Sequence, residues 1–271
     1  MVSENPFKKG KIKKFYERTQ IAKQVQAARN KDRNPGETGI DSYNLNRGSN
    51  FYKLALAGFE ELFSYLKTLK TGLVLEIGAG TGRALKEIKE MPMAKGLSFR
   101  ATALYNHPDI RHNLGQEDFT LTSMETLRGI EPESVAGVLS MYSITYAEHP
   151  KLAMAKINEV LIPGGIIKAV FPFHGNEVST TSGLVFKRPE VFIKYLIELG
   201  YDVSYRDNKF TTPFLVEEQF YYGTSILLAI KPGNPQAPKA DSLMDEDSRL
   251  LNQSSSLKIE GINFFDVDIM G

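Results

Sequence analysis

The sequence contains no cysteine among its 271 residues, which excludes disulfide scaffolds, thiolate-bound zinc, iron–sulfur clusters and a cysteine nucleophile. It has no uninterrupted apolar stretch near the roughly 18 residues of a spanning helix, and no apolar region follows its basic first residues. We therefore expect a cytoplasmic protein without a membrane segment. An overall charge bias is also missing, because 33 basic residues balance 32 acidic ones.

The balanced total conceals a charge gradient along the chain. Residues 1–33 carry a net charge of +7, and residues 232–271 carry −4. We therefore predict three parts: a basic N-terminal helix and loop at 1–50, a folded domain at 51–231, and an acidic, Pro/Ser-rich tail at 232–271. The N-terminal part would be a cap or an arm.

Short apolar runs alternate with helical patterns through the folded domain. Strands are expected at 73–77, 98–104, 136–141, 165–171, 202–206 and 223–231, and helices at 12–30, 51–70, 83–91, 150–161 and 189–199. This alternation predicts the doubly wound, Rossmann-like α/β class, with a mostly parallel sheet covered by helices on both faces. No clear helix separates the last two strands, so an antiparallel hairpin is expected at one edge of the sheet.

The first of these strands runs into a glycine-rich turn, which is the most informative motif of the sequence. In the segment from Glu76 to Gly82, three glycines allow the backbone to approach a ligand closely before the next helix begins. A dinucleotide fingerprint would need glycine at Arg83, so the spacing favours a ligand without a pyrophosphate. Glu76 could pair with an ammonium group. The alternative is a tight turn that needs glycine only for packing.

With this turn, the segment 51–231 resembles the class I S-adenosylmethionine-dependent methyltransferases, in the branch that acts on small molecules and other assorted acceptors. Three further segments carry the resemblance in the same order: Tyr105–Asp109, Ser123–Leu127 and Val135–Gly165. The resemblance implies a seven-stranded sheet, with S-adenosylmethionine as cofactor. The sequence departs from the family at three acids, because Tyr105, Ser123 and Ala136 stand where the family has carboxylates.

The resemblance implies a site for each part of the cofactor. Cofactor-binding residues are expected at Glu76, Gly78, Ala79, Gly80, Gly82, Tyr105, Asn106, Ser123, Met124, Ser140 and Met141. Candidate general bases, needed only if the acceptor loses a proton, are His149, Tyr146 and His174, although each could instead be a helix-start or loop residue. The span 209–222 could close over the acceptor. No metal is expected, because the four histidines lack ligand spacing.

The favoured hypothesis is a methyltransferase that acts on a small-molecule acceptor, with nucleic acid disfavoured as a partner. One alternative is a catalytically inactive, methyltransferase-like binding or scaffold protein, which the three missing acids motivate. A further alternative is a protein or RNA methyltransferase whose basic arm holds the partner. The acceptor itself cannot be predicted, because fold does not determine specificity.

Overall fold

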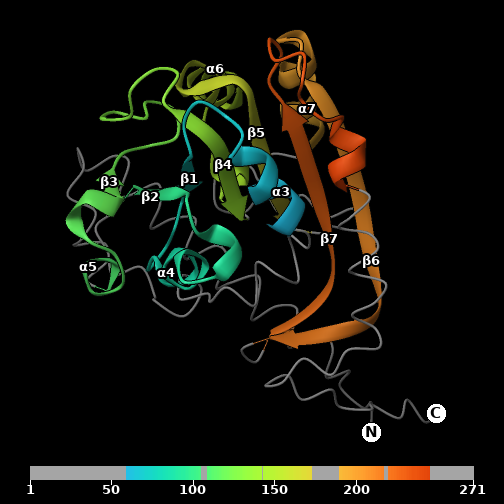
Figure 1. Cartoon of the computed structure of the whole chain (residues 1–271). Helices are drawn as coiled ribbons and strands as arrows, with labels where there is room; N and C mark the ends of the chain where they lie inside the picture. Colours follow the sequence, from blue (N-terminus) through green and yellow to red (C-terminus); the bar gives the residue numbers. More distant parts are fainter. Residues whose placement is uncertain (1–58, 105–108, 142, 173–188, 217–218, 245–271) are drawn as a thin grey trace, which may run out of the picture.

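The structure is a computed structural model that describes residues 59–104, 109–141, 143–172, 189–216 and 219–244, with the side chains of 208–224 left undescribed (Figure 1). Several predicted features lie outside these residues. They are the helix at 12–30, the start of the helix at 51–70, the segment 105–108, and the loop from 173 to 188, which includes His174. The basic arm and most of the acidic tail also lie outside the described residues.

Seven strands form one mixed sheet, in the order β3-β2-β1-β4-β5-β7-β6, which confirms the predicted fold class. The strands are β1 (Leu73–Ile77), β2 (Ser98–Ala103), β3 (Phe119–Leu121), β4 (Val135–Met141), β5 (Leu161–Pro172), β6 (Asp202–Val216) and β7 (Gln219–Ile230). Strands β1 to β5 are parallel, and β7 is antiparallel to both β5 and β6. The carboxyl ends of the parallel strands therefore meet at one edge of the sheet, where ligands bind in open α/β folds.

Helices cover both faces of this sheet, and each face has its own apolar core. The helices are α3 (Phe59–Leu66), α4 (Arg83–Lys89), α5 (Ile110–Asn113), α6 (Pro150–Val160) and α7 (Pro189–Glu198), with short 3-10 turns η3 (Pro92–Ala94), η4 (Gln116–Asp118) and η5 (Ile144–Tyr146). Helices α3 and α4 share a core with one face, and α6 and α7 share a core with the other. Strand β4 is fully buried, as a central strand with two covered faces should be.

The hairpin of β6 and β7 is longer than the sequence indicated. The last pair between β5 and β7 is Pro172↔Thr224, whereas β6 and β7 continue to pair with each other as far as Val216↔Gln219. The span 209–222 is therefore mostly strand, and it extends past the carboxyl edge of the sheet in Figure 1.

The chain packs against the core beyond the sheet, within the segment expected to begin the tail. Ala240, Leu243 and Met244 are buried and join the core on the α3 side. The first 13 residues after Lys231, 232–244, therefore belong structurally with the folded part, although their Pro/Gly-rich start is typical of a linker.

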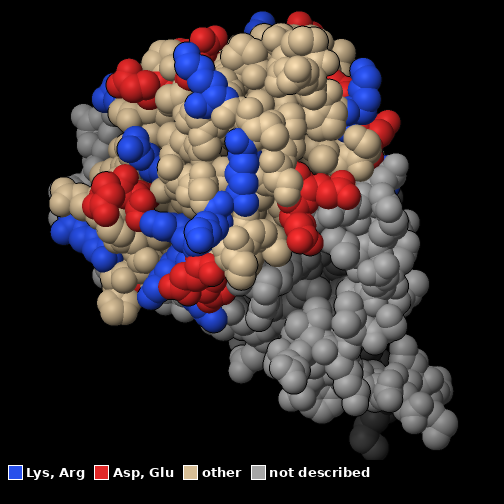
Figure 2. Space-filling model, viewed as in Figure 1, with Lys and Arg blue, Asp and Glu red and all other residues tan. Residues whose placement is uncertain are grey.

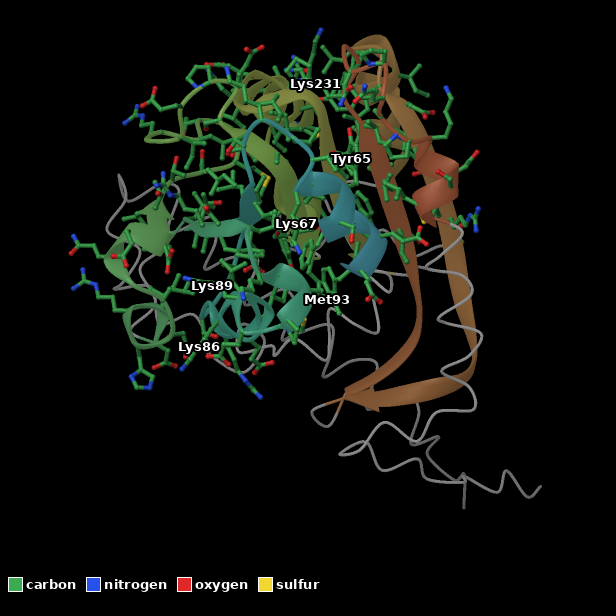
Figure 3. The ribbon with its side chains drawn as sticks, in the orientation of Figure 1. Tyr65, Lys67, Lys86, Lys89, Met93 and Lys231 are labelled. Atoms are coloured by element: carbon green, nitrogen blue, oxygen red, sulfur yellow. The ribbon has the colours of Figure 1, made fainter. Side chains whose placement is uncertain are left out.

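The surface is charged in both signs. On the face seen in Figure 2, Lys and Arg side chains are interspersed with Asp and Glu among the described residues. Lys67 follows α3, and Lys86 and Lys89 belong to α4 (Figure 3). Lys89 forms an ion pair with Asp118. None of the helices in the described part of the chain has the length and apolar character needed to cross a membrane.

The amino edge of the sheet is closed by hydrogen bonds between distant segments. The Tyr65 hydroxyl donates to the Gly164 carbonyl at 2.9 Å. Lys231 Nζ donates to the carbonyls of Asn158 at 2.8 Å and Leu161 at 2.6 Å, which lie at the end of α6. Figure 3 labels Tyr65 and Lys231 on this side of the molecule. The edge that remains for a ligand is the opposite one.

Candidate active site

The glycine turn lies between β1 and α4 at the carboxyl edge. Gly78, Gly80 and Gly82 have φ angles of 73°, 59° and 75°, a left-handed conformation that favours glycine. The amide groups of Gly78 and Ala79 both donate to the Thr102 carbonyl, at 2.8 and 3.0 Å. These two amides therefore fix the turn to β2, and Gly78 can offer a ligand its exposed backbone surface.

Two of the three glycines are also required by packing against other parts of the chain. A Cβ on Gly78 would lie 2.4 Å from Ser143 Cβ, and a Cβ on Gly82 would lie 2.7 Å from Leu114 Cδ1. At Gly82 the left-handed φ of 75° favours glycine, and an added Cβ would in addition press on the end of the Leu114 side chain. Gly78 combines both properties, because its backbone is exposed while its side-chain direction is filled by Ser143.

The loop after β4 contacts this turn through two serines. Ser140 Oγ and Ser143 Oγ are 2.7 Å apart, and the Ile144 amide donates to Ser140 Oγ at 3.0 Å. Ser143 Oγ donates to the Ile77 carbonyl, immediately before Gly78. Ser140 is fully buried, so its hydroxyl has no surface for a cofactor, whereas Ser143 is half-buried. The role of Ser140 in cofactor binding stays a prediction, and in the structure its hydroxyl contacts Ser143.

The loop after β3 lies at the same carboxyl edge of the sheet as the loop after β4. Ser123 is half-buried, and its Oγ lies 3.1 Å from Thr126 Oγ1. Met124 is buried in the core on the α6 side. The Glu125 carboxylate accepts a hydrogen bond of 2.8 Å from the Glu148 amide, which belongs to the segment after β4. The loops after β3 and β4 are thereby connected.

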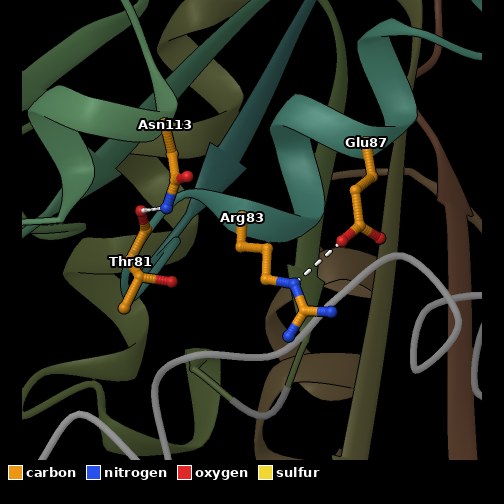
Figure 4. A network of polar contacts seen from close by, with 4 residues as sticks. All are labelled: Thr81, Arg83, Glu87 and Asn113. Atoms are coloured by element: carbon orange, nitrogen blue, oxygen red, sulfur yellow. Dashed lines mark hydrogen bonds and ion pairs between the residues drawn. The ribbon is translucent and has the colours of Figure 1, made fainter.

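Polar contacts from α5 and within α4 surround the start of α4 (Figure 4). Asn113 Nδ2 donates to the Thr81 carbonyl at 2.9 Å, which connects the end of α5 to the turn. Arg83 Nε donates to Glu87 Oε1 at 2.9 Å along the surface of α4. The turn is therefore fixed by β2, α5 and the loop after β4.

The candidate general bases differ in their surroundings. Tyr146 is half-buried in η5, where its amide donates to the Ser143 carbonyl at 3.0 Å. His149 is exposed, and its carbonyl accepts the Ala153 amide at the start of α6. This contact fits the alternative interpretation of His149 as a helix-start residue. Tyr105, Asn106 and His174 lie outside the described residues.

The geometry brings together most of the described candidates. Glu76, Gly78, Ala79, Gly80, Gly82, Ser123, Met124, Ser140, Met141 and Tyr146 lie at or next to the carboxyl ends of β1, β3 and β4. Glu76 lies in β1, next to its last residue, and is 3% exposed. A buried carboxylate, half-buried hydroxyls and an exposed glycine backbone suit a ligand with amino and hydroxyl groups, so these residues fit a nucleoside that carries an amino acid.

Residues 75–169 match the family model described as "Methyltransferase domain". Residues 75–169 therefore carry a class I, S-adenosylmethionine-dependent methyltransferase domain. S-adenosylmethionine is the cofactor of this family, so the domain is that of a methyl-transferring enzyme, as the glycine turn and the order of the motifs indicated. No curated protein matches the sequence significantly.

Three of the solved structures with a similar fold illustrate the degree of likeness. One is a phosphoethanolamine N-methyltransferase 2 of Haemonchus contortus, at 15% identity, TM-score 0.47, and coverage of 68% of this chain and 57% of that one. Another is a SAM-dependent methyltransferase of Aquifex aeolicus, at 14% identity, TM-score 0.45, and coverage of 70% and 98%. The third is YcgJ of Bacillus subtilis, at 13% identity, TM-score 0.47, and coverage of 68% and 100%. Likenesses of this degree carry no information about the acceptor.

The sequence did not single out Ser143 or Thr102 as parts of the methyltransferase site. Ser143 stands four residues after Leu139, the last β4 residue paired with β1, and nothing in its local sequence marks it. Thr102 accepts both turn amides through its backbone, which any residue could do. Both contacts depend on how strands distant in sequence are paired.

Proposed function

We propose that this chain transfers a methyl group from S-adenosylmethionine to a small-molecule acceptor at the carboxyl edge of its sheet. One observation carries the proposal: the left-handed glycine turn, with Gly78 exposed, lies at the end of β1 inside the segment that matches a methyltransferase domain. Two half-buried hydroxyls of this edge, those of Ser123 and Ser143, come from the loops after β3 and β4.

Each group of residues has a role in this proposal. Glu76 and the glycine turn would hold the methionine end of the cofactor, Tyr105 and Asn106 would bind the ribose, and Ser123 and Met124 would bind the adenine. Met141 would support the cofactor from the end of β4, and Ser140 would support Ser143. S-adenosylmethionine supplies an electrophilic methyl group, which the acceptor's lone pair takes as the sulfur–methyl bond breaks. The chain must mainly align the acceptor and exclude water.

The acceptor site is proposed between the loops after β4 and β5 and the projecting hairpin. The β6–β7 hairpin extends past Pro172 on the same edge as the turn, so it forms a lateral wall for this space. If the acceptor loses a proton, Tyr146, His149 or His174 would take it. The interspersed charges in Figure 2 favour a small acceptor over nucleic acid, which needs a continuous basic face.

Calorimetric titration of the whole chain with S-adenosylmethionine and S-adenosylhomocysteine tests the proposal. We expect binding of both ligands, and a ligand concentration of 100 times Kd should stabilise the fold by about 2.7 kcal/mol in thermal unfolding. An absence of heat and of thermal shift at millimolar ligand would reject the proposal. Binding without methyl transfer to any member of a panel of small amines, thiols and hydroxyl compounds would instead favour the inactive binding protein.

A gain-of-function variant sharpens this test. Ser123 stands where the family has an acid, so Ser123→Asp should tighten S-adenosylhomocysteine binding by about tenfold through a charge-assisted hydrogen bond. The matched control is Ser134→Asp, which adds the same charge to another half-buried serine, just before the amino end of β4. Equal effects of the two variants would remove Ser123 from the proposed adenine end.

A further inference from the structure

Two serines and two backbone groups form one hydrogen-bonded chain between the ends of β4 and β1. The Ile144 amide donates to Ser140 Oγ at 3.0 Å, Ser140 Oγ lies 2.7 Å from Ser143 Oγ, and Ser143 Oγ contacts the Ile77 carbonyl. We call these four groups the serine relay. It begins in the loop after β4 and ends one residue before the exposed Gly78.

The chemistry of the groups fixes the direction of every bond in the serine relay. A carbonyl oxygen only accepts, so the single hydroxyl proton of Ser143 goes to Ile77. The bond between the two hydroxyls must then use the proton of Ser140, which in turn accepts from the Ile144 amide. Each hydroxyl donates once and accepts once, and aligned bonds of this kind strengthen one another.

The serine relay connects β1 and β4 just beyond the point where their direct pairing stops. The pairing of β1 with β4 stops at Glu76↔Leu139, so Ile77 lies one residue beyond the last pair. Ile77 is 2% exposed, and Ser143 supplies its carbonyl with a hydrogen bond in the direction of the loop after β4. Ser143 Cβ also occupies the direction in which a side chain at Gly78 would point. The hydrogen bond to Ile77 and the contact with Gly78 therefore together fix the position of Gly78 relative to the loop after β4.

We propose that Ser143 is a positioning residue for the cofactor, and that it acts by holding Ile77 and Gly78 at a fixed distance from the loop after β4. Ser140 sets the orientation of Ser143 and has no contact with the cofactor. The inference rests on the proposed function, because it assumes that the methionine end of the cofactor reaches Gly78. It adds a mechanism by which the loop on the acceptor side controls the turn on the cofactor side.

Ser143→Ala tests this role with two probes that differ only at the methionine end. S-adenosylhomocysteine carries the amino acid, and methylthioadenosine has a methyl group in its place. We expect Ser143→Ala to weaken S-adenosylhomocysteine by about tenfold and methylthioadenosine by less than about twofold, because only the former reaches the turn. Ser143→Cys keeps the shape with a weaker donor and should fall between wild type and Ser143→Ala.

Ser134→Ala is the matched control. Ser134 is also half-buried, and its hydroxyl donates to a backbone carbonyl, that of Glu131 at 2.6 Å, but it lies just before the amino end of β4. It should leave the affinities for both probes unchanged. If Ser143→Ala leaves the ratio of the two affinities unchanged, either because it weakens the binding of both probes equally or because it weakens neither, the positioning role is overturned.

A measurement without cofactor separates this inference from the proposed function. The melting-temperature losses of Ser140→Ala and Ser143→Ala should not add in the double variant, because either change breaks the same chain of bonds. Additive losses would overturn the serine relay while leaving cofactor binding intact. Non-additive losses in a protein that binds neither probe would keep the relay as a structural feature, and would overturn both the proposed function and the positioning role of Ser143.

Discussion

Substitution of Gly78 by alanine should destabilise the fold through two separable effects. The residue has a φ of 73°, which costs an alanine about 1 to 2 kcal/mol. The added Cβ would also lie 2.4 Å from Ser143 Cβ and 2.9 Å from Ser143 Oγ, and overpacking of this kind costs about 1 to 3 kcal/mol. Alanine regains about 0.4 to 1 kcal/mol by restricting the unfolded chain. The net loss should be about 1 to 5 kcal/mol, with a central value of about 3 kcal/mol.

Gly96→Ala is the control that isolates the first effect. Gly96 has a φ of 90°, and a Cβ there would meet nothing within 4 Å. It should therefore show only the conformational cost, about 1 kcal/mol after the unfolded-state gain. Urea unfolding monitored by circular dichroism measures both variants.

The steric effect can be removed without restoring glycine at 78. Ser143→Gly deletes the atoms that an alanine at 78 would meet, so the double variant should recover about 1 to 3 kcal/mol relative to the sum of the two single changes. A loss at Gly78→Ala no larger than that at Gly96→Ala would refute the packing of Ser143 against the turn. Full additivity with Ser143→Gly would refute it as well.

Three further predictions concern the supports of the site and of the sheet. Asn113→Ala should lower the free energy of unfolding by about 1 to 2 kcal/mol in urea unfolding, because the Thr81 carbonyl loses the hydrogen bond of 2.9 Å from Asn113 Nδ2. The control Glu87→Gln, which alters the surface ion pair with Arg83 on α4, should change it by less than about 0.5 kcal/mol. Lys231→Met should cost about 1 to 3 kcal/mol in the same assay, because the carbonyls of Asn158 and Leu161 at the end of α6 lose a charged donor. A loss below about 0.5 kcal/mol would contradict a stabilising role of these two hydrogen bonds. Burial raises the pKa of Tyr201 above its ordinary value of 10.0, so the stability that the neutral hydroxyl contributes is complete below pH 10.0 and is lost as the pH rises beyond it. Tyr201→Phe should therefore make the free energy of unfolding less dependent on pH above 10.0, and parallel pH profiles of the two proteins would argue against this.

The sequence predicts the centre of the sheet well, because burial on both faces leaves a continuous apolar run. Strands β1 and β4 are such runs, and both were located within a residue of their bounds. The three-residue strand β3 was not located, since its residues are half-buried or exposed and no periodicity can develop over this length. Its existence followed only from the family resemblance.

Two other differences lie outside the centre of the sheet. Among the described residues, the outer part of the β6–β7 hairpin pairs only with itself beyond Pro172, without the third strand whose packing would impose an apolar pattern. The buried residues Ala240, Leu243 and Met244 follow a chain rich in proline and glycine, but their spacing of three and four residues is a helical signal that could have located them.

The candidate site was predictable in part. The glycine turn and the loop positions followed from the order of the motifs, whereas the use of the Gly78 and Ala79 amides by Thr102 depends on the pairing of β1 with β2. The burial of Ser140 likewise depends on tertiary contacts. Sequence therefore predicts which segments meet at the edge, and the structure is needed to decide which side chains remain accessible.

The hydrogen bond between the Glu125 carboxylate and the Glu148 amide has a consequence for how a bound molecule would be sensed. Because this contact joins the loops that follow β3 and β4, a shift of one loop either breaks the bond or moves the other loop with it. An acceptor that displaces the segment around Glu148 would thus transmit its arrival to the region beside Ser123. Binding of the acceptor would then change the affinity for S-adenosylmethionine.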